Sequence, residues 1–128
     1  MATILIVDDE PAVRGMISEI LIGAGHQVAE AGNGNEALDK CRAIVFDLVL
    51  MDIIMPEKEG LETIRELRQI IPRQRIIAIS GGGRGMDSAF SIQLAALLGA
   101  DYTLEKPFRR AELLALVDAA LGPEPTLQ

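Results

Sequence analysis

The sequence predicts an α/β fold, in which a five-stranded parallel sheet has helices on both faces. Short aliphatic runs rich in β-branched residues alternate along the chain with longer stretches whose apolar residues recur every three or four positions. Strands that alternate with helices are joined by crossover connections, which make neighbouring strands parallel. The runs are also nearly continuous in apolar residues, as is typical of strands buried on both faces.

Five runs are predicted as strands, because each is too short and too β-branched to favour a helix. They are Thr3–Val7, Gln27–Ala31, Leu48–Met51, Arg75–Ile79 and Tyr102–Leu104.

Helical spacing of apolar residues fills the intervals between these runs. Three stripes are explicit: Val13, Met16, Ile17, Ile20 and Leu21; Leu61, Ile64, Leu67 and Ile71; and Leu113, Leu114, Val117 and Leu121. A fourth helix is expected after the Asn33-Gly34 turn, and a fifth from about Gly85 to Leu98. Glycine and proline fall near the expected helix ends.

Length and charge narrow the class of protein. The 128 residues predict one domain over 1–122 and a frayed tail over 123–128, with no output domain following. A net charge of −7 argues against nucleic-acid or anionic-membrane partners. No apolar run is long enough to span a membrane, and the first residues lack the features of a signal peptide.

Cysteine and histidine usage suggests structural roles for both. The single cysteine, Cys41, excludes an internal disulfide and fits a reducing compartment, so a cytoplasmic protein is expected. Because Cys41 lies in a predicted helix, we expect a packed thiol. His26 precedes a strand and is expected to be a surface or hydrogen-bonded histidine, not a metal ligand.

Polar and charged residues follow the predicted strands. Asp8 and Asp9 follow the first strand, Asp52 the third and Ser80 the fourth, and Lys106 lies near the end of the fifth. In an open α/β sheet the functional crevice lies beyond the carboxyl ends of the strands. Three acids, one hydroxyl and one amine are therefore expected to meet in a single crevice.

Such a cluster of carboxylates indicates a cation. Several carboxylates a few ångströms apart do not stay ionised without a counter-charge, and Mg²⁺ prefers oxygen ligands. With Mg²⁺ on one side and Lys106 on the other, the crevice suits a phosphoryl group, to which Ser80 would donate a hydrogen bond. Asp52 is then the candidate nucleophile that forms an acyl phosphate.

Four segments also carry a family resemblance, and they occur in order along nearly the whole chain. They are Val7-Asp8-Asp9-Glu10-Pro11, Leu50-Met51-Asp52-Ile53-Ile54-Met55-Pro56 with Gly60, Ile79-Ser80-Gly81, and Gly99-Ala100-Asp101 through Lys106-Pro107-Phe108. With these segments the chain resembles the response-regulator receiver domains of bacterial two-component signalling. The resemblance implies a (βα)5 flavodoxin-like receiver fold of the single-domain, chemotaxis-regulator type.

The resemblance also implies roles for individual residues. Asp52 would take its phosphoryl group from a histidine kinase or histidine phosphotransfer protein. Mg²⁺ would be bound directly by Asp9, Asp52 and the backbone carbonyl of Ile54, and through water by Asp8. Ser80 would be the switch hydroxyl. Lys106 would bind the phosphoryl group, and its peptide bond to Pro107 is expected to be cis.

The chain departs from the family pattern three residues before the lysine. Receivers of this kind usually carry an aromatic switch residue there, whereas this chain has Thr103, with Tyr102 one position earlier. Adjacent strand residues point to opposite faces, so Tyr102 is not expected to replace the missing ring. The glycine-rich segment 81–85 is expected either to reorganise with Ser80 or to be a plain connector.

These features predict a stand-alone response regulator, which catalyses only its own phosphorylation and slow dephosphorylation and is otherwise not an enzyme. Its output would pass through contacts with an unidentified downstream protein, or through homodimer formation on phosphorylation. The predicted helix from Gly85 to Leu98 has more apolar residues than one core-facing stripe needs, and Phe90 is the candidate partner contact. Burial of that helix on two sides is the alternative.

Other functions were weighed against this one. A relay that passes its phosphate to another histidine, and an interaction module independent of phosphorylation, remain alternatives. A dinucleotide-binding motif is matched by Gly32-Asn33-Gly34-Asn35-Glu36-Ala37, but we reject that function, because Glu30 interrupts the strand that leads into the glycines. An asparagine-glycine turn before a helix is sufficient to explain the motif. A phosphatase with an aspartyl-phosphate intermediate is disfavoured, because Ile54 occupies the position where such enzymes carry a general acid.

Overall fold

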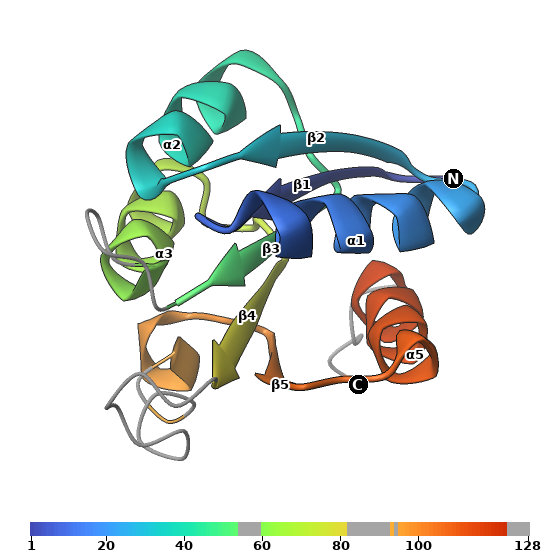
Figure 1. Cartoon of the computed structure of the whole chain (residues 1–128). Coiled ribbons are helices and arrows are strands. Elements are labelled where there is room, and N and C mark those ends of the chain that lie inside the picture. Colours follow the sequence, from blue (N-terminus) through green and yellow to red (C-terminus); the bar gives the residue numbers. More distant parts are fainter. Residues whose placement is uncertain (54–59, 82–92, 94, 123–128) are drawn as a thin grey trace, which may run out of the picture.

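The sheet has five parallel strands in the order β2-β1-β3-β4-β5 (Figure 1). The computed structural model describes residues 1–53, 60–81, 93 and 95–122. Its elements are β1 (Thr3–Val7), α1 (Pro11–Gly23), β2 (Gln27–Ala31), α2 (Gly34–Ala43), β3 (Leu48–Asp52), α3 (Gly60–Ile70), β4 (Ile76–Gly81), β5 (Tyr102–Lys106) and α5 (Arg110–Leu121). Residues 95–98 are also helical.

The predicted strands are confirmed, and three of them run further than expected. β1 and β2 have the predicted bounds, but β3 includes Asp52, β4 runs to Gly81, and β5 runs to Lys106. Asp52 is still in register with Ile79, and Gly81 with Lys106. Each of these three strands was predicted to end at its last apolar residue. The ladder continues because backbone hydrogen bonds do not require an apolar side chain.

Two apolar layers lie on opposite faces of the sheet, as alternation along a strand requires. On β1, Leu5 and Val7 belong to the layer covered by α2 and α3, whereas Ile4 and Ile6 belong to the layer covered by α1 and α5 (Figure 1). The helices on each face therefore bury alternate residues of the same strands.

Burial on both faces holds for the inner strands only. β3 is buried throughout, and β1 is buried from Ile4 onward. β2 and β5 are the edges of the sheet, and in each of them only one residue is fully buried, Ala31 and Leu104. The expectation of strands buried on both sides is thus wrong for the edges, because an edge strand has a neighbour on one side only.

The Gly99-Ala100-Asp101 segment is held by one arginine of α3. Arg68 Nε donates to the Gly99 carbonyl at 2.8 Å, and Arg68 Nη2 donates to Asp101 Oδ2 at 2.9 Å. The same guanidinium donates to the carbonyls of Pro72 and Gln74. It therefore joins the end of α3 to the turn that leads into β5.

Replacing Arg68 by methionine is expected to lower the free energy of unfolding by about 3 kcal/mol, because hydrogen bonds from a charged group to several carbonyls are lost together. Urea unfolding measures this change. Arg65→Met is the control, since Arg65 is exposed on the same helix. Equal losses in the two variants would contradict the role given to Arg68.

Cys41 and His26 have the structural roles predicted for them. Cys41 is buried, and burial raises the pKa of its thiol to about 11. His26 Nδ1 accepts a hydrogen bond from the Ala2 backbone N–H at 3.2 Å. Within the described residues, no helix is both long and apolar enough to cross a membrane. Ile54, segment 82–85, Phe90 and the tail 123–128 lie outside the described residues.

Candidate functional site

Three charged side chains project from the carboxyl edge of the sheet on the side of α1 and α5. Asp8, Asp52 and Lys106 each come two positions after a core residue of that face, namely Ile6, Leu50 and Leu104. Alternate residues of a strand share a face, so the three side chains share theirs. Asp8 follows the end of β1 but continues its ladder, because its N–H donates to the Ala31 carbonyl at 3.1 Å.

Lys106 joins the two aspartates. Its Nζ lies 3.3 Å from Asp8 Oδ2 and 3.5 Å from Asp52 Oδ2. The exposed fraction of the side chain is 18% for Lys106, 1% for Asp8 and 5% for Asp52. Burial by itself lowers the pKa of Lys106, but the charges of Asp52 and Asp8 outweigh it and raise that pKa above its ordinary value. The amine is therefore held in its charged form.

A cation-binding set of oxygens lies beside this ion pair. Asp8, Asp9 and Glu10 can each offer one carboxylate oxygen, and these oxygens lie within 4.8 Å of one another. Asp9 Oδ1 is buried and has no hydrogen-bond partner among the described residues. A buried carboxylate oxygen without a donor, in a set made only of oxygens, fits a hard divalent cation such as Mg²⁺.

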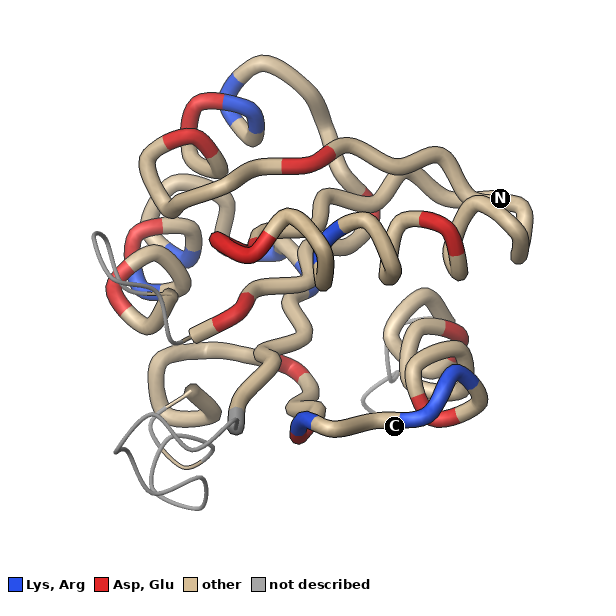
Figure 2. The backbone as a smooth tube through the Cα atoms, viewed as in Figure 1, with Lys and Arg blue, Asp and Glu red and all other residues tan. Residues whose placement is uncertain are grey.

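The composition of this set differs in part from the prediction. Glu10 was not predicted as a site residue, although it is the third acid of the run that the sequence displays. Asp52 is not in the group of three acids. It is connected to that group by Lys106, which contacts both Asp52 and Asp8. Figure 2 shows the acidic stretch after β1 and the acidic end of β3 side by side, in keeping with the pairing of Val7 with Met51.

Ser80 adds an available hydroxyl. It follows Ile79, the register partner of Asp52 on the neighbouring strand, and only 1% of the residue is exposed. Its Oγ has no hydrogen-bond partner among the described residues. Ser80 comes two positions after Ala78, a residue of the layer under α2 and α3, so it points to the other face of the sheet from Asp52. Leaving a buried hydroxyl unpaired costs free energy, so a ligand oxygen within its reach would gain a hydrogen bond.

Tyr102 and Thr103 lie on opposite faces of the sheet, as predicted. Tyr102 is in register with Ile77, a residue of the layer under α1 and α5, and its hydroxyl lies 3.5 Å from the Ala119 carbonyl of α5. Thr103 is half-buried and in register with Ala78, which belongs to the other layer. Tyr102 therefore does not take the position of the missing aromatic residue.

Gly60 brings the start of α3 against the end of β3. A Cβ built on Gly60 would lie 2.2 Å from the Asp52 carbonyl oxygen and 2.5 Å from Ile53 Cα. Both of these atoms belong to the backbone, so a side chain cannot be accommodated by rotation of a neighbour. Glycine at this position allows α3 to pack directly on the backbone of Asp52.

The glycine-rich motif before α2 is a helix cap. Asn33 is the N-cap of α2, and its Oδ1 accepts a hydrogen bond from the Glu36 N–H at 2.8 Å. This is the asparagine-glycine turn predicted as the alternative to dinucleotide binding. The motif has a structural explanation that needs no ligand.

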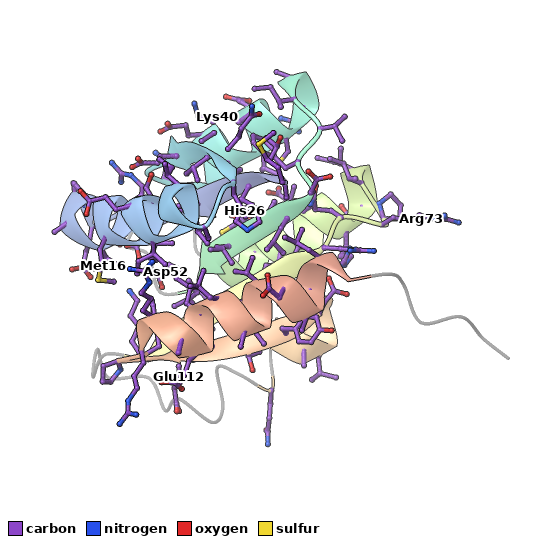
Figure 3. All side chains as sticks on the ribbon, turned by 90° about the vertical axis from the view of Figure 1, so that its right-hand side faces the viewer. Met16, His26, Lys40, Asp52, Arg73 and Glu112 are labelled. Carbon is purple, nitrogen blue, oxygen red and sulfur yellow. The ribbon has the colours of Figure 1, made fainter. Side chains whose placement is uncertain are left out.

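The two open cavities of the described structure lie away from this site. Their volumes are about 720 Å³ and 580 Å³, and Arg73 lines both. Figure 3 shows Arg73 at the opposite end of the molecule from Asp52. The candidate site is thus defined by side-chain chemistry at the carboxyl edge of the sheet and lies away from both of these cavities.

Comparison with known families gives one family model over most of the chain. The model described as "Response regulator receiver domain" matches residues 4–118.

Curated relatives of similar length match as well. The chain is 39% identical over 112 residues to the chemotaxis protein CheY of Thermotoga maritima, covering 87% of this chain and 90% of that protein. It is 40% identical over 120 residues to CheY of Bacillus subtilis, covering 93% and 97%. Among solved structures, CheY4 of Vibrio cholerae superposes with a TM-score of 0.85 at 32% identity, covering 94% of this chain and 99% of that one.

Proposed function

This chain belongs to the response-regulator receiver family, and from that premise we propose that Asp52 is its phosphoryl acceptor. The observation that supports this assignment is the contact of Lys106 Nζ with both Asp52 and Asp8 at the carboxyl edge of the sheet. Asp52 is the acid of this edge that belongs to the central strand β3. A carboxylate beside a fixed ammonium is suited to receiving a group with several anionic oxygens.

In the proposed transfer, an Asp52 carboxylate oxygen attacks the phosphorus of a phosphohistidine. The new O–P bond makes an acyl phosphate, the P–N bond breaks, and the leaving imidazole nitrogen keeps the electron pair. Lys106 binds one phosphoryl oxygen, and the Ser80 hydroxyl donates a hydrogen bond to another. The chain acts here as a signalling domain that promotes its own phosphorylation and slow dephosphorylation.

Mg²⁺ is the proposed cofactor of this transfer, and when bound it would neutralise charge on the phosphoryl oxygens. Asp9 and Asp52 are the proposed direct ligands, together with the backbone carbonyl of Ile54, and Asp8 is proposed to act through water. The buried, unpartnered Asp9 Oδ1 supports this assignment. Glu10 supplies a further carboxylate in reach of the same position.

The signal is proposed to leave through phosphorylation-dependent contacts. A histidine kinase or histidine phosphotransfer protein would be the donor, and a downstream protein or a second copy of the chain would be the recipient. The phosphoryl group shifts the population toward the active arrangement only through contacts that differ between the two states. Ser80 is the proposed switch contact, and its buried hydroxyl, which has no hydrogen-bond partner among the described residues, supports this role.

Incubation with acetyl phosphate and Mg²⁺, followed by intact-protein mass spectrometry, tests the proposal. The wild-type chain is expected to gain the mass of one phosphoryl group, and Asp52→Asn is expected to gain none. Chelation of Mg²⁺ should abolish the gain in the wild type. Asp118→Asn is the control, since Asp118 is exposed on α5 and lies outside the site. Undiminished phosphorylation of Asp52→Asn would overturn the assignment.

A further inference from the structure

Arg14 makes two contacts that the proposed reaction does not use. It lies in the first turns of α1, with 20% of its side chain exposed. Its Nη1 donates to the Asp8 backbone carbonyl at 2.7 Å, and its Nε lies 2.9 Å from Glu30 Oε1 on β2. One guanidinium therefore joins α1, the end of β1 and the edge strand β2.

We propose that Arg14, held by Glu30, is a positioning residue that fixes the β1–α1 turn so that its carboxylates can bind Mg²⁺. This inference rests on the proposed function, because it concerns the same cation site. Arg14 would not touch the ion. It would act through the backbone of Asp8, to which Asp9 is directly attached.

Asp8 is restrained at each of its polar groups, which is what a positioning role requires. Its N–H donates to the Ala31 carbonyl, and its Oδ1 accepts from the Glu10 N–H at 2.9 Å. Its Oδ2 meets Lys106, and its carbonyl accepts from Arg14. The Arg14 contact therefore sets the direction of the peptide group between Asp8 and Asp9.

Glu30, with 41% of its side chain exposed, gives Arg14 a second contact. The planar guanidinium can meet a carboxylate and a carbonyl at the same time with two of its N–H groups, whereas the ammonium of a lysine has no such fork. With the Nε bound to Glu30, the Nη1 is aimed at the turn. Residues that hold metal ligands in place commonly change metal affinity by tenfold or more when they are removed.

The charge of Arg14 and its proposed positioning role predict opposite effects on Mg²⁺ binding when Arg14 is replaced. Arg14 is a cation beside an acidic site, so by Coulomb's law its removal alone should tighten Mg²⁺ binding. If Arg14 instead fixes the turn, its removal should weaken binding although the site becomes more negative. The sign of the change therefore separates the two roles.

Isothermal titration of Mg²⁺ into the folded protein at low temperature measures this sign. The dissociation constant is expected to rise about tenfold in Arg14→Met. Arg14→Lys, which keeps the charge but loses the fork, should also weaken binding. Arg42→Met is the matched control and should leave the constant unchanged, because it removes the same charge from an exposed pair with Asp39 on α2.

Each outcome bears on the proposal. Mg²⁺ binding by Arg14→Met as tight as in the wild type, or tighter, would overturn it. If Arg14→Met does not fold, Arg14→Lys decides, because it keeps the charge, and wild-type affinity in that variant would overturn the proposal. A wild-type chain that neither binds Mg²⁺ nor is phosphorylated would remove the proposed function itself. Wild-type phosphorylation combined with unchanged Arg14 variants would remove only the positioning role.

Discussion

Replacement of Gly60 by alanine is expected to lower the free energy of unfolding by about 3 kcal/mol or more, because the new methyl group overlaps backbone atoms that cannot rotate away. The added Cβ would lie 2.2 Å from the Asp52 carbonyl oxygen and 2.9 Å from the Asp52 carbonyl carbon. Relief requires α3 to move away from β3. Urea or thermal unfolding measures the loss.

The same substitution is expected to slow phosphorylation of the fraction that remains folded, because the displaced backbone is that of the proposed acceptor Asp52. Gly15→Ala is the control. A Cβ at Gly15 would meet nothing within 4 Å, so alanine there should stabilise α1 by up to about 1 kcal/mol. Equal stability changes in the two variants would show that the close packing of α3 on β3 is not present in solution.

Replacement of Lys106 by methionine is expected to cost about 2–3 kcal/mol of stability in the absence of Mg²⁺. The substitution removes the ammonium group that contacts the buried carboxylates of Asp8 and Asp52. Breaking a buried ion pair is destabilising because it leaves buried charge that is no longer compensated. Mg²⁺ is expected to restore part of this loss by binding the carboxylates of the native state. Thermal unfolding with and without Mg²⁺ measures both effects.

The pH dependence of the Lys106→Met effect follows from the raised pKa of Lys106. A cationic group with a raised pKa contributes its full stabilisation below its ordinary value near 10.5 and loses it as the pH rises through the folded-state pKa. The stability difference between wild type and Lys106→Met should therefore be maintained from neutral pH upward and shrink only in strong alkali. A difference that vanished between pH 7 and 9 would contradict the charged amine described above.

Two further variants complete the test of Lys106. Lys40→Met, on α2, is the control for loss of a lysine. Adding Asp52→Asn to Lys106→Met should recover stability, because it removes one of the two buried negative charges that lost the ammonium. In the proposed function, Lys106→Met should also lose the response to phosphorylation, since the amine is the fixed contact for a phosphoryl oxygen.

Local patterns in the sequence were sufficient to predict the strands and helices and to identify much of the candidate site. Two strands have the predicted bounds, and Asp52, Ser80 and Lys106 lie at the ends of the strands to which they were assigned. For the inner strand β1 this agreement follows from burial, because a strand covered on both faces has a continuous apolar run. The cis peptide bond between Lys106 and Pro107, expected from the resemblance, is confirmed.

Two further expectations remain predictions, one implied by the resemblance and one drawn from the excess of apolar residues in the predicted helix from Gly85 to Leu98. The Ile54 carbonyl as a Mg²⁺ ligand and Phe90 as a partner contact both fall outside the described residues. The three strands that were predicted too short at their ends, β3, β4 and β5, show the limit of an apolar criterion, because backbone pairing continues past the last apolar side chain.

The sequence by itself determined which residues are strands and helices and which side chains stand at the strand ends, because those properties follow from local periodicity. The sequence also predicted that the polar residues at the strand ends converge, but only the tertiary structure decided which atoms touch, such as Lys106 Nζ and Asp8 Oδ2, 98 residues apart. The tertiary structure also revealed that the Glu10 carboxylate lies near those of the aspartates and that Arg14 donates to the Asp8 carbonyl. It further showed that Gly60 packs against the backbone of Asp52. These contacts depend on which elements become neighbours, and a period of two or of 3.6 residues specifies the face of an element but not its neighbour.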